Sequence, residues 1–149
     1  MRCRNLKTLP EFLPWRHKQI EDNEPTVTNS AALRISALMG FLAVGLGAFG
    51  AHGLKDLLAR NGTVSIWEKA VFYHFIHTVM LFVLAGRSPL RSGPWFSFLA
   101  GILIFSGSLY LLALTNLKWF GAITPIGGLS FLAGWLWLII APQRKDKPE

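Results

Sequence analysis

This chain of 149 residues is poor in cysteine and in charge, and both shortages limit what it can be. A single cysteine, Cys3, excludes an internal disulfide bond and a paired-cysteine site. Only 15% of the residues are charged, with 8 acidic residues against 15 basic ones. Catalytic signatures are also missing, because we find no nucleophile elbow, phosphate-binding glycine loop or HExxH sequence. These absences argue against a disulfide-bonded domain and against the common enzyme classes.

Charged residues are absent altogether from four long apolar stretches, which make up about half of the chain. They are 17, 16, 21 and 22 residues long and cover residues 35–51, 70–85, 95–115 and 120–141. At a rise of about 1.5 Å per residue, each stretch with its flanks comes near the roughly 30 Å of a membrane's hydrocarbon core. The sequence therefore predicts an all-α membrane protein, a four-transmembrane-helix bundle with spans at about residues 31–51, 67–86, 94–115 and 120–141.

Polar segments flank this transmembrane domain, which we expect at residues 31–141. Residues 1–30 contain three prolines and no sustained helical periodicity, which predicts a flexible polar extension. Residues 142–149 form a basic tail. One alternative is that translation starts near Val27. Another is that the first apolar stretch belongs to a cleaved signal peptide, but the stretch is longer than the usual apolar core of such peptides.

Lys and Arg are distributed unequally between the two sides of the predicted bundle. Eleven belong to the N-terminal segment, the second loop and the tail, and four belong to the other side: Lys55, Arg60, Lys69 and Lys118. Short loops rich in these residues tend to stay in the cytoplasm. We therefore predict a multi-pass protein of the cell inner (plasma) membrane with both termini cytoplasmic. The basic residues flank apolar stretches instead of forming a patch of their own, so we expect no nucleic-acid partner.

A short amphipathic segment follows the first span. Three leucines recur at helical spacing within residues 54–58, and Asn61-Gly62 is a typical helix stop. This pattern predicts a short interfacial helix. Ser65 and Glu68 then form a capping-box pattern, which predicts that the second span begins at residue 66 or 67.

Small residues form stripes on the first and fourth predicted helices. The first stripe has spacings of 4, 3, 4 and 3 residues and consists of Ser36, Gly40, Ala43, Gly47 and Gly50. The second consists of Gly127, Ser130 and Gly134. In lipid, close backbone approach and van der Waals contact hold helices together. We expect both stripes to pack against neighbouring helices.

Pro125 either kinks the fourth helix or marks its first turn.

Four strings of the sequence, taken together, resemble a known family. They are Leu46-Gly-Ala-Phe-Gly-Ala-His52, the pair Tyr73 and His77, Ser106-Gly-Ser-Leu-Tyr110, and Thr124-Pro-Ile-Gly-Gly128 with Ser130-Phe-Leu-Ala-Gly-Trp135. Over about residues 31–141 the chain resembles the YgdD-like family of small inner-membrane proteins, a domain of unknown function with eukaryotic transmembrane relatives. The resemblance implies four membrane passes and no established activity, cofactor or substrate. His52 and His77 fall on the family pattern, whereas His74 and residues 1–30 do not.

Three histidines are the titratable imidazoles in or beside the predicted spans. His74 and His77 share roughly one face of the second span, and His52 closes the first. Intramembrane ionisable groups are costly unless they are used or paired, so these three and Tyr73 are the candidate functional residues. Hydrogen bonding between helices is the preferred interpretation, ahead of proton or ion handling and of a metal or haem site. The apolar stretches hold no Asp, Glu or Cys to complete a metal site, so we expect neither metal nor cofactor.

We accordingly expect no catalytic residues and no enzymatic activity. The expected role is that of a small structural or interaction component of the membrane. Its expected partners are the lipid bilayer, further copies of the chain or other membrane proteins. The alternative is a small transporter or proton- or ion-conducting protein that uses the histidines of the first two spans. Such a protein would be oligomeric, because four helices leave little room for a wide pore.

Overall fold

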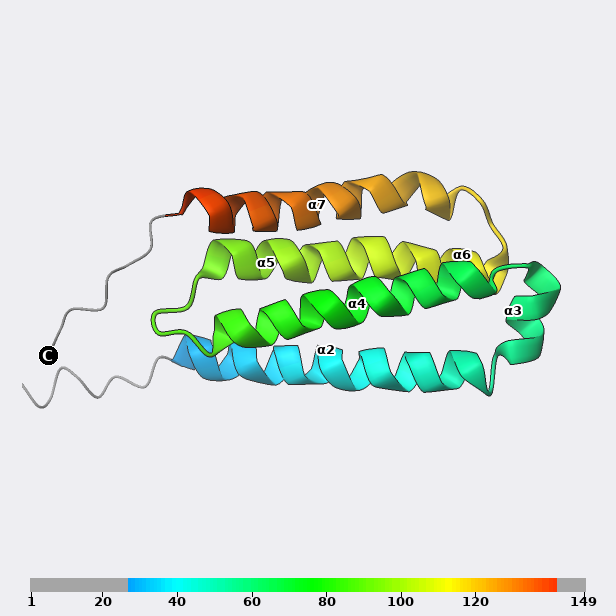
Figure 1. Cartoon of the computed structure of the whole chain (residues 1–149), viewed down its shortest axis with the longest axis horizontal. Helices are drawn as coiled ribbons and strands as arrows, with labels where there is room; N and C mark the ends of the chain where they lie inside the picture. Colours follow the sequence, from blue (N-terminus) through cyan, green and yellow to red (C-terminus); the bar gives the residue numbers. More distant parts are fainter. Residues whose placement is uncertain (1–26, 142–149) are drawn as a thin grey trace, which may run out of the picture.

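The computed structural model describes residues 27–141, which contain helices and no strand. The helices are α2 (Val27–Ala51), α3 (Lys55–Asn61), α4 (Val64–Ala85), α5 (Ser92–Gly101), the π-helical turn η1 (Ile102–Ser106), α6 (Gly107–Thr115) and α7 (Phe120–Ile140). Four helical spans within these described residues are long and apolar enough to cross a membrane, and α3 is the short helix expected after the first of them (Figure 1). The predicted fold class is thus confirmed. Of the extension predicted at residues 1–30, residues 27–30 belong to α2, so the prediction is wrong for these four residues, because the first helix continues beyond the apolar stretch. Residues 1–26 and the tail predicted at residues 142–149 lie outside the described residues.

The spans lie in space in the order in which they follow along the chain (Figure 1). The helix α4 packs between α2 and the continuous span of α5, η1 and α6, and this span packs on α7. Within residues 27–141, α2 and α7 have no close backbone contact with each other. The buried share of the most apolar stretch is therefore 39% in α4 and 33% in the third span, but only 17% in each outer helix.

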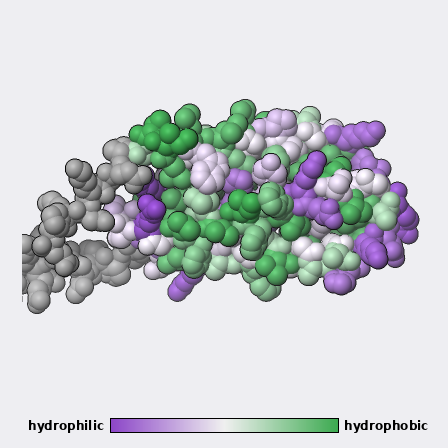
Figure 2. Space-filling model, in the orientation of Figure 1, coloured by the Kyte–Doolittle hydropathy of each residue, from purple (hydrophilic) through white to green (hydrophobic). Residues whose placement is uncertain are grey.

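The flanks of the molecule are apolar and its ends are polar. Figure 2 shows mainly hydrophobic residues along the flank, and hydrophilic residues gathered at the end that carries α3. Large side chains on the outer helices point away from the protein, and Phe41 and Ile139 are 75% and 78% exposed. Such exposure would be costly in water, whereas in lipid it needs no compensation.

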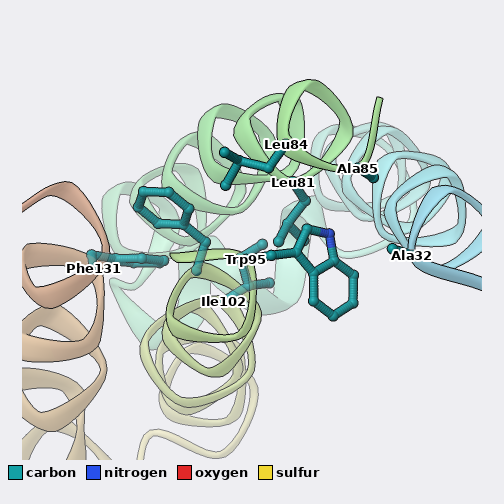
Figure 3. Close-up of a cluster of buried hydrophobic side chains, with 8 residues drawn as sticks. Ala32, Leu81, Leu84, Ala85, Trp95, Ile102 and Phe131 are labelled. Atoms are coloured by element: carbon teal, nitrogen blue, oxygen red, sulfur yellow. The ribbon is translucent and has the colours of Figure 1, made fainter. Parts of the chain in front are cut away.

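A buried cluster joins all four spans near the start of α2. It consists of Ala32, Leu81, Leu84, Ala85, Trp95, Phe98, Ile102 and Phe131. The Trp95 ring extends from α5 toward Ala32 on α2 (Figure 3). Its Nε1–H donates a hydrogen bond to Ser36 Oγ at 3.3 Å, and the Ser36 hydroxyl donates to the Ala32 carbonyl at 2.8 Å. The large ring reaches α2 because the residues facing it there are small.

The opposite end is held by hydrogen bonds to the last carbonyls of α6. Gly62 ends α3 in the left-handed conformation, with φ of 66°. Immediately after it, the Thr63 hydroxyl donates to the Ala113 carbonyl at 2.9 Å. The Asn61 side-chain amide donates to the carbonyls of Ala113 and Leu114 at 3.1 and 3.2 Å. These carbonyls have no partner within their own helix, so the turn between α3 and α4 caps α6.

The start of α4 differs from the prediction. The helix begins at Val64, so the prediction of a start at residue 66 or 67 is wrong. The physical reason is that the Thr63 carbonyl already accepts hydrogen bonds from the N–H groups of Ile66 and Trp67, at 3.1 and 3.0 Å. The first turn therefore forms before Ser65, which leaves that residue inside the helix and not at its cap.

Two features of the third and fourth spans add to the sequence expectations. Pro125 lies inside α7, which begins at Phe120, so the alternative that Pro125 marks the first turn is wrong. The third span is interrupted by η1, a wider helical turn. A π-helical turn adds a residue to the helix and shifts the faces on its two sides relative to each other. Here the turn lies where α5–α6 meets both α4 and α7.

Candidate functional site

The His77 ring is held between α4 and α7. It stacks on Phe131 with ring centroids 3.6 Å apart and planes at 11°. Its Nδ1–H donates to the Tyr73 carbonyl at 2.8 Å, and its Nε2 accepts a hydrogen bond from Trp135 Nε1 at 3.4 Å. Both ring nitrogens are thus used by the neutral tautomer that carries its proton on Nδ1, a form assigned from these partners.

His74, one turn earlier, faces the third span. Its Nδ1 lies 3.3 Å from the Tyr110 hydroxyl, and the two rings meet edge to face at 6.2 Å. The Nε2 atom of His74 is buried without a hydrogen-bond partner among the described residues, as are Thr78 Oγ1 and Ser106 Oγ. Thr78 is one turn after His74, and Ser106 is one turn before Tyr110 in an antiparallel neighbour. The middle of the bundle therefore contains a small group of unpaired polar atoms.

Tyr73 lies at the lipid-facing side of the same region. The centroid of its ring lies 4.7 Å from the centroid of the Phe105 ring and 6.0 Å from that of the His77 ring, on which it stacks. Together with residues of η1 and α7 it lines a groove of about 600 Å³ on the outside of the bundle. Tyr73 and His77 are therefore brought together, in an aromatic wall.

His52 is not part of this group. It is exposed just beyond the end of α2, where its backbone N–H donates to the Ala48 carbonyl at 3.1 Å. Within residues 27–141, no hydrogen bond or ring contact joins it to His74 or His77. The described residues also contain no group of three or more His, Cys, Asp or Glu side chains that could hold a metal ion.

The small residues of α2 face α4. Gly50 lies directly against the Trp67 indole, whose Nε1–H donates to the Leu46 carbonyl at 3.1 Å. A Cβ at Gly47 would lie 3.3 Å from Val71, and one at Gly40 would lie 3.6 Å from Thr78. Ser36 and Ala43 are each 1% exposed. The three glycines of this stripe thus contact α4, Ser36 accepts the hydrogen bond from Trp95 of α5, and Ala43 is buried.

On α7 the small residues face the third span in two of three cases. Gly127 lies against the backbone of Phe105, with 2.7 Å between a Cβ placed there and the Phe105 Cα. Gly134 lies against the Phe98 ring, at 2.8 Å by the same measure. Ser130 is only half-buried, and its hydroxyl donates to the Ile126 carbonyl of its own helix at 3.3 Å. The buried side chain between the two glycines is Phe131.

Four residues that contact the histidines are not singled out as candidates by the sequence pattern: Phe98, Tyr110, Phe131 and Trp135. A signal does exist, because Phe131 and Trp135 are four residues apart and so share a helix face. Tyr110 and Trp135 also end two of the four strings that carry the family resemblance. Which of these faces meets α4 depends on the shift that η1 introduces, and η1 has no signal in the sequence.

Comparisons with known proteins agree with this structure. A family model described as "Protein of unknown function (DUF423)" matches residues 46–128. The chain is 50% identical to a UPF0382 membrane protein of Staphylococcus epidermidis and 48% identical to one of Staphylococcus haemolyticus. Each comparison spans 112 residues, 72% of this chain and 90% of the relative. The UPF0382 membrane protein YwdK of Bacillus subtilis is 41% identical over 114 residues, 72% of this chain and 91% of the relative.

No solved structure matches the chain. The relatives are named membrane proteins, and the four apolar helices agree with those names. The resemblance to a small membrane family of unknown function is confirmed by the matching family model and by these relatives. The chain is a multi-pass membrane protein, and it belongs to the DUF423 family of proteins of unknown function.

Proposed function

We propose that this protein is a non-enzymatic structural or interaction component of the bacterial inner membrane. The observation that carries the proposal is the row-like order of the spans, which leaves the two outer helices largely uncovered. Only 17% of the apolar stretch of α2 or of α7 is buried, about half the share of the inner spans. The exposed faces of these helices offer long apolar surfaces to lipid, to a second copy of the chain or to another membrane protein.

The contacts in the interior support a packing role for most of the polar candidates. His77 is stacked and bonded through both nitrogens, and Tyr73 belongs to the same aromatic wall. Side chains or backbone of a neighbouring helix lie directly against the glycines of both stripes. Side chains used in this way stabilise helix contacts and need no ligand to be satisfied.

Site-specific photo-crosslinking in native membranes tests the proposal. A photoreactive residue at Phe41 on α2 or at Leu132 on α7 faces outward, whereas one at Leu81 is enclosed and serves as the control. We expect discrete protein adducts from the outer positions and none from Leu81. Identification by mass spectrometry separates self-association from a different partner. Lipid adducts alone from both outer positions would contradict the proposal.

We further propose that both chain termini face the cytoplasm. The support is the distribution of Lys and Arg, eleven on the side of the termini and four on the side of α3. The start of α2 and the end of α7 lie at the same end of the bundle, so the two orientations are clearly distinct (Figure 1). A reporter enzyme that works only outside the cytoplasm should be active when it is inserted at Gly62. A reporter that works only inside the cytoplasm should be active when it is fused after Glu149. The opposite pattern would reverse the orientation.

A second candidate function, proton or ion conduction, is favoured by three buried polar atoms, two on α4 and one on η1, that have no hydrogen-bond partner among the described residues. His74 Nε2, Thr78 Oγ1 and Ser106 Oγ are buried in the middle of the bundle. Buried polar atoms are normally paired, so water or an ion would satisfy them. Proteoliposomes with His74→Phe, with His52→Phe as an exposed control, test this alternative. Flux that is present in the control and lost in His74→Phe would favour conduction over the packing role.

A further inference from the structure

A second groove lies at the α3 end of the molecule, away from His74 and His77. It has a volume of about 630 Å³ and is formed by α2, α3 and α4. On α2 it is lined by Gly47 and Gly50, which contribute no side chains to fill it. The Trp67 indole forms part of the wall and is tied to the Leu46 carbonyl by its hydrogen bond, so it does not swing out across the opening.

The groove has an apolar part and a charged rim. Along α4 the lining continues through Val71, Phe72 and Phe75 toward the middle of the membrane. At the α3 end the rim carries one cation, Lys55, and one anion, Glu68. Both side chains are exposed, and neither forms an ion pair with a residue in the range 27–141. Figure 2 shows hydrophilic residues gathered at this end, next to the hydrophobic flank.

An apolar trough with opposite charges at its water-facing end matches an amphiphile that carries both a cation and an anion in its head. We propose that this groove binds a phospholipid with a phosphoethanolamine headgroup. The acyl chain lies along α4, the Lys55 ammonium contacts the phosphate, and the lipid's primary ammonium donates hydrogen bonds to the Glu68 carboxylate. Hydrogen bonds between charged groups are the strong ones, and the long Lys55 side chain can reach the headgroup while its stem stays on apolar surface.

The same chemistry predicts discrimination between lipids. A phosphatidylcholine headgroup has no N–H to donate, so it loses the hydrogen bonds to Glu68. A phosphatidylglycerol headgroup has no cation, so it offers no positive charge to pair with the Glu68 carboxylate. Phosphatidylethanolamine should therefore bind more tightly than either. This inference depends on the chain spanning a membrane and is independent of the orientation and of the proposed interaction role.

Native mass spectrometry of the full chain in mild detergent, with equal amounts of the three lipids, tests the inference. We expect bound phosphatidylethanolamine to exceed the other two lipids. Lys55→Gln should lower its binding by about tenfold, the factor that corresponds to one lost hydrogen bond between charged groups. Glu68→Gln should abolish the preference over phosphatidylglycerol. Lys69→Gln, an exposed neighbour that does not line the groove, is the matched control and should bind like the unmodified protein.

A variant that fills the groove tests lipid binding without changing any charge. Ala51 is exposed and lines the groove, so Ala51→Trp should block lipid binding while the thermal unfolding temperature stays unchanged. Equal binding of the three lipids, or the same lipid profile in Lys55→Gln and Lys69→Gln, would overturn the inference. A dimer whose formation displaces the lipid and is lost in Ala51→Trp would also overturn it, by identifying a second copy of the chain as the occupant.

Discussion

Two adjacent glycines on α7 provide a sharp test of the helix packing. A Cβ at Gly127 would meet the backbone of Phe105, whereas a Cβ at Gly128 would lie 3.8 Å from the ring of the same residue, an ordinary contact. Replacing each glycine by alanine adds the same methyl group to the same helix. The two variants therefore differ only in what that methyl group touches.

The expected cost at Gly127 follows from the geometry. The Phe105 Cα would lie 2.7 Å from the new Cβ, where nonbonded carbons prefer about 3.5–4.0 Å, so α7 has to move away by about 1 Å. Overpacking usually costs about 1–3 kcal/mol. We expect the upper end of this range, about 3 kcal/mol, because backbone atoms cannot rotate aside as a side chain can. The better helix propensity of alanine returns about 1 kcal/mol. We expect Gly127→Ala to lower the free energy of unfolding by about 2 kcal/mol, after that offset.

Gly128→Ala should instead raise the free energy of unfolding by up to about 1 kcal/mol, because alanine favours the helix and meets no obstacle. Reversible unfolding in mixtures of a mild detergent and sodium dodecyl sulfate, followed by far-ultraviolet circular dichroism, measures both changes. If Gly127→Ala is as stable as the unmodified protein, or if both variants are destabilised equally, the close approach of α7 to η1 is refuted.

Three further substitutions test other contacts with the same unfolding assay. Gly50→Ala should cost about 1–3 kcal/mol by displacing the Trp67 indole, whereas Gly45→Ala, which meets nothing within 4 Å, should stabilise the protein by up to about 1 kcal/mol; similar values for the pair would contradict the indole contact. His77→Phe keeps a stacked ring and should cost less than about 1.5 kcal/mol, while His77→Ala should cost about 3 kcal/mol; equal losses would exclude stacking as the main role. Thr63→Val removes a donor to the end of α6 and should cost about 1 kcal/mol, and Thr63→Ser, which keeps the hydroxyl, should cost clearly less if the cap matters.

The features that the sequence predicts well are those fixed by the bilayer and by helical geometry. A transmembrane helix needs an uncharged stretch that is long enough to cross the hydrocarbon core, and this condition alone locates the four spans. The spacing of the small residues on α2 places them on one face, because residues three and four apart share a face in any α-helix. That face is the one that contacts α4, and its prediction needs no tertiary information.

The parts that the sequence does not predict depend on contacts between spans. The π-helical turn at Ile102–Ser106 contains neither proline nor glycine. It occurs where the Phe105 backbone meets Gly127, so it belongs to the contact with α7 and not to local propensity. The partners of His74 and His77 lie on the third span and on α7, and their register relative to α4 depends on this turn. The sequence therefore identifies the histidines but not the aromatic rings that surround them.

Because the spans lie side by side in the order of the chain, the order of synthesis and the order of packing coincide. Of the described spans, α2 leaves the ribosome first and meets α4 next, and the Asn61 and Thr63 side chains are already in place when the end of α6 arrives. Each span therefore finds a neighbour as soon as it enters the bilayer, and most backbone contacts join spans that are consecutive in the chain. Membrane insertion of this protein can proceed hairpin by hairpin, with α7 following the other described spans and completing the buried core with Phe131.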